Sequence, residues 1–235
     1  GAKDGKVLWQ KNVGKDFGAK SSNPGWGLAC SPLVLGDRLL LDLGKAIALD
    51  KKTGALVWSS GTELAAYSSP TLTKVGGRTF MNCFTPHGLV LVDVANGKEL
   101  ARARWETSYD VNAASPIESG GRIFVSSGYG KGCGLFEVKG SALELVYESK
   151  KMRNHCNSCV LLGGNLYGMD GQMGGRGALA CLDFATGEMK WQEKGFAPGG
   201  IIVADGMILA MCDKGELVVA EASPEKYTEL ARAKV

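Results

Sequence analysis

Short apolar stretches separated by glycine turns recur along the whole chain. Each copy has an apolar stretch, a Gly-Gly, Gly-Asp or Asp-Gly turn and a second apolar stretch, a pattern typical of a β-hairpin. In the first three copies a proline opens the hairpin, and Cys159 and Ile201 stand at that position in the last two. The copies begin at Ala29, Tyr67, Ala113, Cys156 and Pro198.

A second hairpin follows each of these. Its turn reads Asp-x-x-Thr-Gly or Asn-Gly between apolar strands in 47–58, 90–101 and 179–191, and it is diverged in 135–147 and 217–231. Each repeat therefore holds four strands in roughly 42 residues, the repeat length of a propeller blade. Periodicity of 3.6 residues is almost absent, and the repeat register predicts a turn and an outer strand, not a helix, for 223–235.

The repeats predict an all-β fold, a β-propeller of four-stranded antiparallel blades in which 1–235 is a single propeller. The expected blades are 27–61, 65–106, 111–150, 154–194 and 197–235, and 1–14 is expected to be the last hairpin of a preceding blade. Unfinished blades leave exposed strand edges. We therefore expect a fragment of a seven- or eight-bladed ring; a closed five-bladed ring is the alternative.

The unit Ala-x-Asp-x-x-Thr-Gly-x-x-x-Trp ends at Trp58, recurs with a leading cysteine up to Trp191, and its tail recurs up to Trp9. It resembles the repeat of pyrroloquinoline-quinone-like β-propellers. The resemblance implies that these three tryptophans dock between blades, near the glycine of the next blade, where a large apolar ring can still donate its N–H. Ala101 and Glu144 replace the tryptophan in the other repeats, so plainer interfaces are expected there, with Tyr147 near the second.

The repeat is also similar to that of the outer-membrane assembly lipoprotein of Gram-negative bacteria, which presents loops to partner proteins. "TSYDVNAASP", "VSSGYGKGCGL" and "MRNHCNSCVL" resemble secreted propellers of planctomycete-type bacteria. These resemblances imply a non-enzymatic scaffold, periplasmic or secreted, that binds protein or peptide and possesses no catalytic residues. The chain shows no signal-peptide pattern.

Quinoprotein dehydrogenases share this repeat, and the resemblance makes an oxidoreductase with pyrroloquinoline quinone and calcium the main alternative. Such an enzyme would need an adjacent cysteine pair, and no two cysteines are neighbours here. Asp110, Asn112 and Asn154 have suitable side chains for calcium but form no recognisable motif, and Trp26 is the candidate for stacking on the quinone. We therefore expect no cofactor and no metal.

In a propeller, the segments that lead into the blades cross one face near the axis. Leu28, Ala66, Asn112, His155 and Ala197 are expected to surround that axis. The candidate ligand-binding residues are Trp26, Tyr67, Tyr109, Asp110, Asn112, Arg153, Asn154 and His155. Aromatic rings with Arg, Asp and Asn suit a peptide, sugar or small ligand, and a carbohydrate- or polymer-binding module of a degradative system is a further alternative. These residues would otherwise pack and hydrogen-bond the blade ends.

Cys156 and Cys159 form a C-x-x-C pair directly after His155. A haem link needs histidine where Val160 stands, a strand start provides no helix dipole to lower a thiol pKa, and zinc needs four ligands. Buried free thiols and a local disulfide remain.

Charge and composition argue against nucleic acid as a partner and against a membrane span. The net charge is +3 with no basic run, which argues against nucleic acid. No apolar run approaches the length of a membrane span. Glycine at 34 residues and proline at 7 fit many short strands with tight turns.

Overall fold

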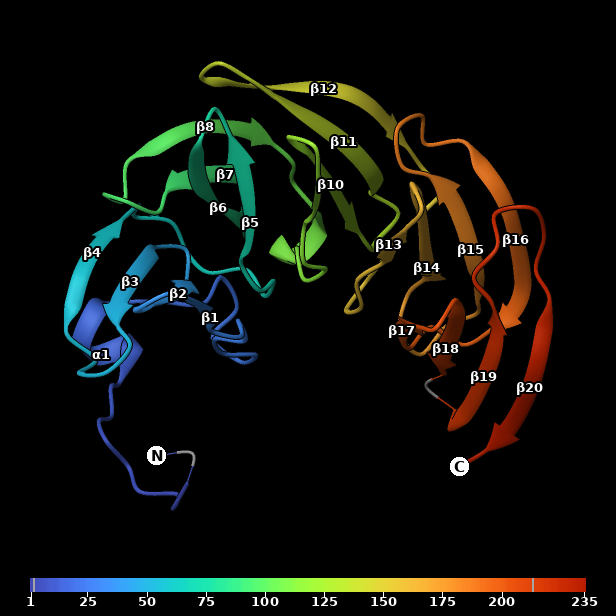
Figure 1. Cartoon of the computed structure of the whole chain (residues 1–235), viewed down its shortest axis with the longest axis horizontal. Helices are drawn as coiled ribbons and strands as arrows, with labels where there is room; N and C mark the ends of the chain where they lie inside the picture. The colour runs from blue at the N-terminus through green and yellow to red at the C-terminus, as the bar shows by residue number, and fades with distance from the viewer. Residues whose placement is uncertain (2, 213) are drawn as a thin grey trace. The chain divides into compact units, whose positions relative to one another are not determined.

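The computed structural model describes residues 1, 3–212 and 214–235, and the chain divides into two compact units, Gly1–Asp110 and Val111–Val235 (Figure 1). Within the described residues, strands form five four-stranded antiparallel sheets, each from consecutive strands. None of the helices in this part of the chain is long and apolar enough to cross a membrane. The fold is all-β, as the repeats predicted.

The first unit contains two of these sheets. One pairs β1 (Leu33–Leu35), β2 (Arg38–Asp42), β3 (Ala46–Asp50) and β4 (Leu56–Ser60). The other pairs β5 (Thr71–Val75), β6 (Arg78–Thr85), β7 (Gly88–Asp93) and β8 (Glu99–Arg104), and the short 3-10 helix Ser108–Asp110 follows.

The second unit contains three sheets. The strands of the first are β9 (Ile117–Ser119), β10 (Arg122–Ser127), β11 (Gly132–Lys139) and β12 (Ala142–Ser149). Those of the second are β13 (Val160–Leu162), β14 (Asn165–Gly171), β15 (Gly177–Asp183) and β16 (Met189–Phe196). Those of the third are β17 (Gly200–Ala204), β18 (Met207–Met211), β19 (Glu216–Glu221) and β20 (Glu229–Lys234), so the end of the chain is a strand, as its repeat register predicted.

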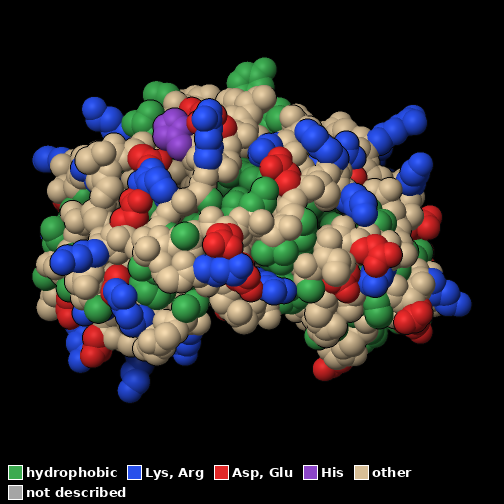
Figure 2. All heavy atoms as spheres, turned by 90° about the horizontal axis from the view of Figure 1, so that it is seen from above, with side chains coloured by type: hydrophobic (Ala, Val, Ile, Leu, Met, Phe, Trp, Pro, Cys, Tyr) green, Lys and Arg blue, Asp and Glu red, His purple; other side chains and the backbone are tan. Residues whose placement is uncertain are grey.

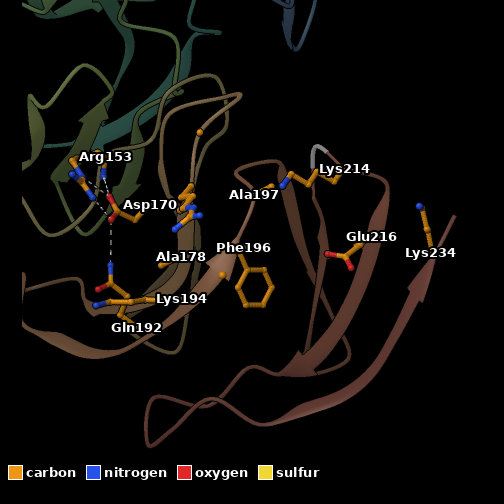
Figure 3. A pocket seen from close by; sticks show the side chains of 14 residues that line it. Arg153, Asp170, Ala178, Gln192, Lys194, Phe196, Ala197, Lys214, Glu216 and Lys234 are labelled. Atoms are coloured by element: carbon orange, nitrogen blue, oxygen red, sulfur yellow. Dashed lines mark hydrogen bonds and ion pairs between the residues drawn. The ribbon is translucent and has the colours of Figure 1, made fainter.

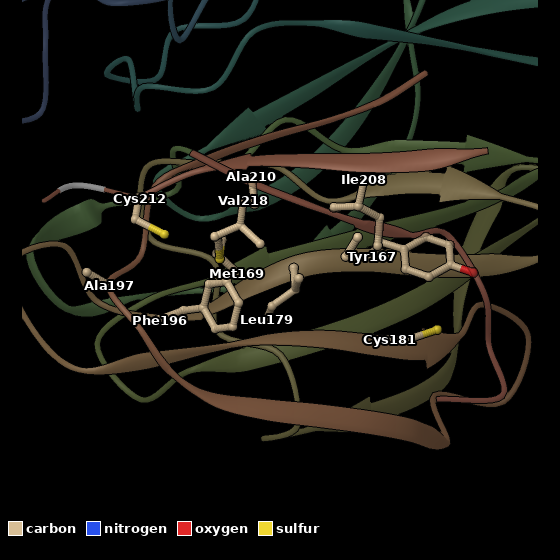
Figure 4. Close-up of a cluster of buried hydrophobic side chains, with 11 residues drawn as sticks. Tyr167, Met169, Leu179, Cys181, Phe196, Ala197, Ile208, Ala210, Cys212 and Val218 are labelled. Carbon is tan, nitrogen blue, oxygen red and sulfur yellow. The ribbon is translucent and has the colours of Figure 1, made fainter. Parts of the chain in front are cut away.

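The core of each unit lies between neighbouring sheets, where the middle strands are most buried. In the first unit, Leu40 of β2 packs in one cluster with Met81 of β6 and Val90 of β7. In the second, Met169 and Leu179 share a cluster with Ile208 and Val218 of the next sheet (Figure 4). Fully burying side chains of this size stabilises a fold by about 1.5–3 kcal/mol each, so this packing joins sheet to sheet.

Aromatic side chains also reach the hairpin turns of the sheet that follows them in the chain, through hydrogen bonds to backbone carbonyls. The indole N–H of Trp58 donates to the carbonyl of Val94 at 3.1 Å, and that of Trp191 donates to the carbonyl of Ser223 at 2.8 Å. Trp9 donates in the same way to the carbonyl of Lys51 at 3.0 Å. Each ring reaches the hairpin turn that carries the Asp-x-x-Thr-Gly pattern, or its diverged copy.

Tyr147 corrects the expectation of a plainer interface in its repeat. Its hydroxyl donates to the carbonyl of Phe184 at 3.0 Å, and a Cβ added at Gly187 would lie 2.7 Å from its ring. Tyrosine therefore takes the place that tryptophan occupies in other repeats. The sequence pattern missed it because the β11–β12 hairpin is two residues longer. Leu135 pairs with Tyr147, twelve residues later, whereas Trp58 and Trp191 pair with residues ten positions before them.

The N-terminal segment also differs from expectation. The described part of 1–14 contains a turn but no strand, and Val13–Phe17 form the helix α1. A two-stranded hairpin alone is only marginally stable. Asn12 instead caps a helix, because its side chain accepts the N–H of Lys15 at 3.0 Å.

Candidate functional site

A cleft of about 780 Å³ opens in the second unit between the sheet β13–β16 and the sheet β17–β20 (Figure 3). One side of the cleft is formed by the segment before β13, the β14–β15 loop and the end of β16. The other side is formed by the start of β19 and the end of β20, which pair with each other. The lining residues are Arg153, Asp170, Gly175, Arg176, Gly177, Ala178, Gln192, Lys194, Gly195, Phe196, Ala197, Lys214, Glu216 and Lys234.

The strand ends explain why polar side chains gather in this cleft. Gln192 and Lys194 lie two residues apart on β16, so the alternation of a strand directs both to one side. Lys234 ends β20, whose residues are all exposed. At the β14–β15 loop, a Cβ on Gly177 would lie 2.5 Å from the carbonyl oxygen of Asp170. Glycine therefore allows the backbone to turn tightly at this wall.

Arg153 and Asp170 form one wall of the cleft. The guanidinium donates from Nε to Oδ1 at 2.8 Å and from Nη2 to Oδ2 at 2.7 Å, and the Arg153 backbone N–H donates to Oδ1 at 2.9 Å. Gln192 donates to Oδ2 at 3.2 Å. The carboxylate raises the pKa of Arg153. The carboxylate of Asp170, with a side chain only 3% exposed, is thus fully engaged and neutralised.

The remaining charges of the cleft are mostly positive. Its other acid, Glu216, pairs with Arg232 at 3.3 Å. Arg176, Lys194 and Lys234 have no ion-pair partner among the residues that the structure describes, and neither has Lys214. On the wider surface, basic and acidic side chains are interspersed (Figure 2). The cleft therefore has the chemistry of a site for a negatively charged, extended ligand.

Two of the residues that the sequence singled out lie together in the first unit. The rings of Trp26 and Tyr67 have centroids 5.7 Å apart and planes at 59°. Tyr109 and Asp110 end that unit with left-handed backbone, at φ of 62° and 59°. Their role in ligand binding stays a prediction, as does the clustering of Leu28, Ala66, Asn112, His155 and Ala197 around an axis.

Asn112 and Asn154 are fully buried in the second unit. The Oδ1 of Asn112 accepts the hydroxyl of Ser127 at 2.7 Å. Asn154 donates from Nδ2 to the carbonyl of Met169 at 3.0 Å, and its backbone N–H donates to the hydroxyl of Ser126 at 2.9 Å. Both amides therefore hold the leading segments of their blades in place.

His155 follows Arg153 by two residues in the segment before β13. Its Nδ1 accepts the backbone N–H of Met173 at 3.3 Å, and its ring meets Tyr129 edge-on with centroids 4.9 Å apart. Burial lowers the pKa of this imidazole. The side chain is therefore a neutral acceptor that fixes the loop after β14 at neutral pH.

The thiols of the C-x-x-C pair are both free, so the disulfide considered from the sequence is not formed in this structure. Cys159 is buried, and its thiol donates to Oδ1 of Asn154 at 3.0 Å. Cys156 is exposed, which corrects the alternative expectation that both thiols are buried. The two side chains point to different surroundings because a strand begins directly after Cys159.

Two of the three side chains considered for calcium are engaged inside the protein. Asn112 and Asn154 already use their side-chain oxygens in hydrogen bonds inside the protein. The described residues contain no group of three or more His, Cys, Asp or Glu side chains arranged to hold a metal. Trp26 packs against Tyr67, a side chain of the protein itself.

The positively charged residues of the cleft were missed by sequence reasoning, apart from Arg153. Arg176 lies in a loop, and Lys194 and Lys234 lie at the ends of outer strands, where no motif marks them. The available signal was positional: in adjacent repeats, the ends of the second and fourth strands lie at the same edge of the blades. Aligning those ends would have brought these cations together.

The four-stranded sheets and their aromatic docking define a β-propeller built from pyrroloquinoline-quinone-type repeats. Residues 1–193 match the family described as Outer membrane protein assembly factor BamB, and the chain belongs to this family. The protein of that name from Moranella endobia (strain PCIT) is 23% identical over 241 residues, which cover 93% of this chain. The chain spans 58% of that relative's length.

Solved structures share the fold. BamB from Moraxella catarrhalis aligns with a TM-score of 0.67 and 15% identity, over 89% of this chain and 64% of its own. A quinohemoprotein alcohol dehydrogenase from Comamonas testosteroni aligns with a TM-score of 0.67 and 13% identity, over 88% of this chain and 43% of its own. At these identities the structural likeness shows the fold, and function must be argued from the site.

Proposed function

We propose that this chain is a non-enzymatic, protein-binding scaffold in an extracytoplasmic compartment, periplasmic or secreted. In this proposal the cleft between β13–β16 and β17–β20 holds an acidic, extended segment of a partner protein. Membership of the assembly-factor family supports the scaffold role, because the relatives are named for the assembly of outer membrane proteins. A role in such assembly is part of the proposal.

The observation that carries the proposal is the charge imbalance of the cleft. Its two acids are each neutralised by an arginine, whereas Arg176, Lys194, Lys214 and Lys234 keep their charges without an ion-pair partner among the described residues. Exposed ion pairs contribute about 0.2–1 kcal/mol each. Four such contacts would bind a flexible acidic segment reversibly, with an affinity that falls as salt rises.

The dimensions of the cleft also favour a peptide. Its volume of about 780 Å³ falls in the range of small-molecule and peptide pockets. Small residues, including Gly175, Gly177 and Ala178, line it between the charged side chains. Backbone can approach closely at such positions, so an extended chain would fit beside the cations.

The oxidoreductase alternative has less support. It would require Asn112 and Asn154 to leave the hydrogen bonds that hold the leading segments of their blades. The likeness to quinoprotein structures concerns the fold. We therefore propose that the chain uses no quinone and no calcium.

Calorimetric titration with two peptides of equal length tests the proposal. One peptide alternates Glu with Ala and the other alternates Gln with Ala. We expect binding of the Glu peptide that weakens between 50 and 300 mM salt, because exposed charges are screened over about 8–10 Å at physiological ionic strength. Equal binding of both peptides, or binding of neither, would show that the cleft is not a docking site for acidic segments.

A further inference from the structure

Trp26 differs from the other tryptophans whose contacts are known. Trp9, Trp58 and Trp191 each donate the indole N–H to a backbone carbonyl of a neighbouring sheet. Trp26 is 55% exposed, and its N–H has no acceptor among the described residues. Trp26 therefore presents an exposed ring face and an indole N–H that a ligand could use.

The loop that carries Trp26 is held firmly. The backbone N–H of Trp26 donates to the carbonyl of Asn23 at 3.0 Å, and the backbone N–H of Gly25 donates to Oδ1 of Asn23 at 3.0 Å. Upstream, the backbone of Ser22 donates to the carbonyl of Ala65 at 3.0 Å, and Ala65 donates to the carbonyl of Lys20 at 2.8 Å. The ring is therefore presented to solvent by a preorganised turn.

The same backbone bonds fix the position of Tyr67, two residues after Ala65. The rings of Trp26 and Tyr67 meet at 59°, so they form a corner and not a parallel stack. The hydroxyl of Tyr67 lies 3.4 Å from that of Ser22. The corner thus combines an apolar ring face with uncharged hydroxyl groups and a free indole N–H.

We propose that Trp26 and Tyr67 form a binding site for a neutral pyranose unit of a glycan. One face of a pyranose presents C–H groups that pack on an aromatic ring, while its rim presents hydroxyls. Here the indole face takes the C–H face, and the Trp26 N–H, the Tyr67 hydroxyl and the Ser22 hydroxyl take the rim. A proline or aromatic peptide side chain would use the ring but would not bond to the indole N–H and the two hydroxyls, which hydrogen-bond to each other in the free protein.

Tryptophan fluorescence of the full chain, titrated separately with maltohexaose, cellohexaose and chitohexaose, tests this site. We expect at least one of the three oligosaccharides to bind. Trp26→Ala should weaken its affinity by about tenfold or more, whereas Trp26→Phe should retain most of the affinity because a ring remains. Tyr67→Phe should weaken it by a smaller factor, since it removes one hydroxyl only. Binding of the Trp26→Ala variant is followed by calorimetry.

Leu64→Ala is the matched control, because Leu64 is a comparably exposed apolar residue, at 45%, on the segment before Tyr67. It should bind like the wild type. The proposal is overturned if none of the three oligosaccharides binds, or if Trp26→Ala binds as well as the wild type. It is also overturned if a proline-rich peptide binds at Trp26 and no oligosaccharide does. None of these results depends on the acidic-segment cleft, which lies in the second unit.

Discussion

Trp58 of one sheet lies directly over Gly97 of the next. The indole N–H donates to the carbonyl of Val94, three residues before the glycine, and a Cβ on Gly97 would lie 2.7 Å from the indole ring. Trp9 has the same relationship with Gly54, at 2.6 Å, and Tyr147 has it with Gly187. The glycine of the Asp-x-x-Thr-Gly turn is therefore the surface on which the aromatic ring of the preceding repeat rests.

Gly97→Ala should destabilise the first unit more than an alanine at a comparable turn. A side chain at this position is disfavoured by the positive φ of +75° and by the contact with Trp58. Together they should lower the free energy of unfolding by about 2–4 kcal/mol. Gly76→Ala is the control, since its φ is +57° but its Cβ would meet open space. Its cost should be about 1–2 kcal/mol. Equal shifts of the two urea unfolding midpoints would contradict the role of the Trp58 contact.

Arg153→Ala should lower the free energy of unfolding by about 1–3 kcal/mol, because Asp170 would remain buried without its counter-ion. This loss of stability is smaller than for a fully buried ion pair, because the arginine side chain is 45% exposed and water screens its charge. Arg153→Ala combined with Asp170→Asn should recover part of the loss. Lys139→Ala, which breaks an exposed pair with Glu144, should change stability by less than about 1 kcal/mol. If Arg153→Ala and Lys139→Ala have the same effect in urea, the pair does not stabilise the wall.

Asp42 should make the stability of the first unit depend on pH. Burial raises its pKa from 3.8 to about 7, against the opposing effect of the N–H groups of Phe84 and Gly44. The folded state thus binds a proton more tightly than the unfolded state, and this group's contribution to stability is lost as pH rises from about 4 to about 7. Other groups facing it include Glu63, Cys30 and Cys83.

Asp42→Asn keeps an acceptor for the N–H of Phe84, which lies 2.9 Å from the carboxylate, but removes the titration. We therefore expect the variant to gain more stability relative to wild type at pH 8 than at pH 5, by up to roughly 3 kcal/mol. Unfolding midpoints measured at several pH values check this. A difference between variant and wild type that does not change with pH would rule out the raised pKa.

The two thiols of the C-x-x-C pair should differ in reactivity. Burial raises the pKa of both thiols, but Cys159 is buried and its thiol donates to Asn154, whereas Cys156 is exposed to reagent. Brief alkylation of the native protein without reductant, followed by peptide mass spectrometry, should label Cys156 and leave Cys159 largely unmodified. Absence of label at both positions, reversed by reductant, would instead demonstrate a disulfide.

The repeat made most of the fold predictable. Short apolar stretches around glycine turns indicated four strands per blade, and even the ambiguous segment after Ser223 was assigned correctly because its register outweighed its weak helical pattern. The docking of Tyr147 was missed since the β11–β12 hairpin is two residues longer than the hairpins that end in a docking tryptophan. The segment before α1 was assigned as a hairpin because a local pattern does not reveal whether neighbouring strands are present.

The candidate cleft was much less predictable. Arg153 was found because it lies in a segment that leads into a blade. Arg176, Lys194 and Lys234 come from a loop and two strand ends separated by up to 58 residues, and their common location depends on how two sheets pack. Asn112 and Asn154 were candidate ligands by residue type, and only the structure shows that both are buried, with Asn112 bonded to the Ser127 hydroxyl and Asn154 to the Met169 carbonyl.

Charge reversal in the cleft tests the central proposal most directly. The affinity of the alternating Glu-Ala peptide is measured for wild type, for the double variant Arg176→Glu/Lys194→Glu, and for Lys74→Glu/Lys98→Glu, which changes the same net charge on exposed positions of the first unit. We predict a loss of about tenfold or more in the first variant and less than about threefold in the second. Equal losses in both variants, or no loss in either, would contradict the assignment of the cleft as the docking site.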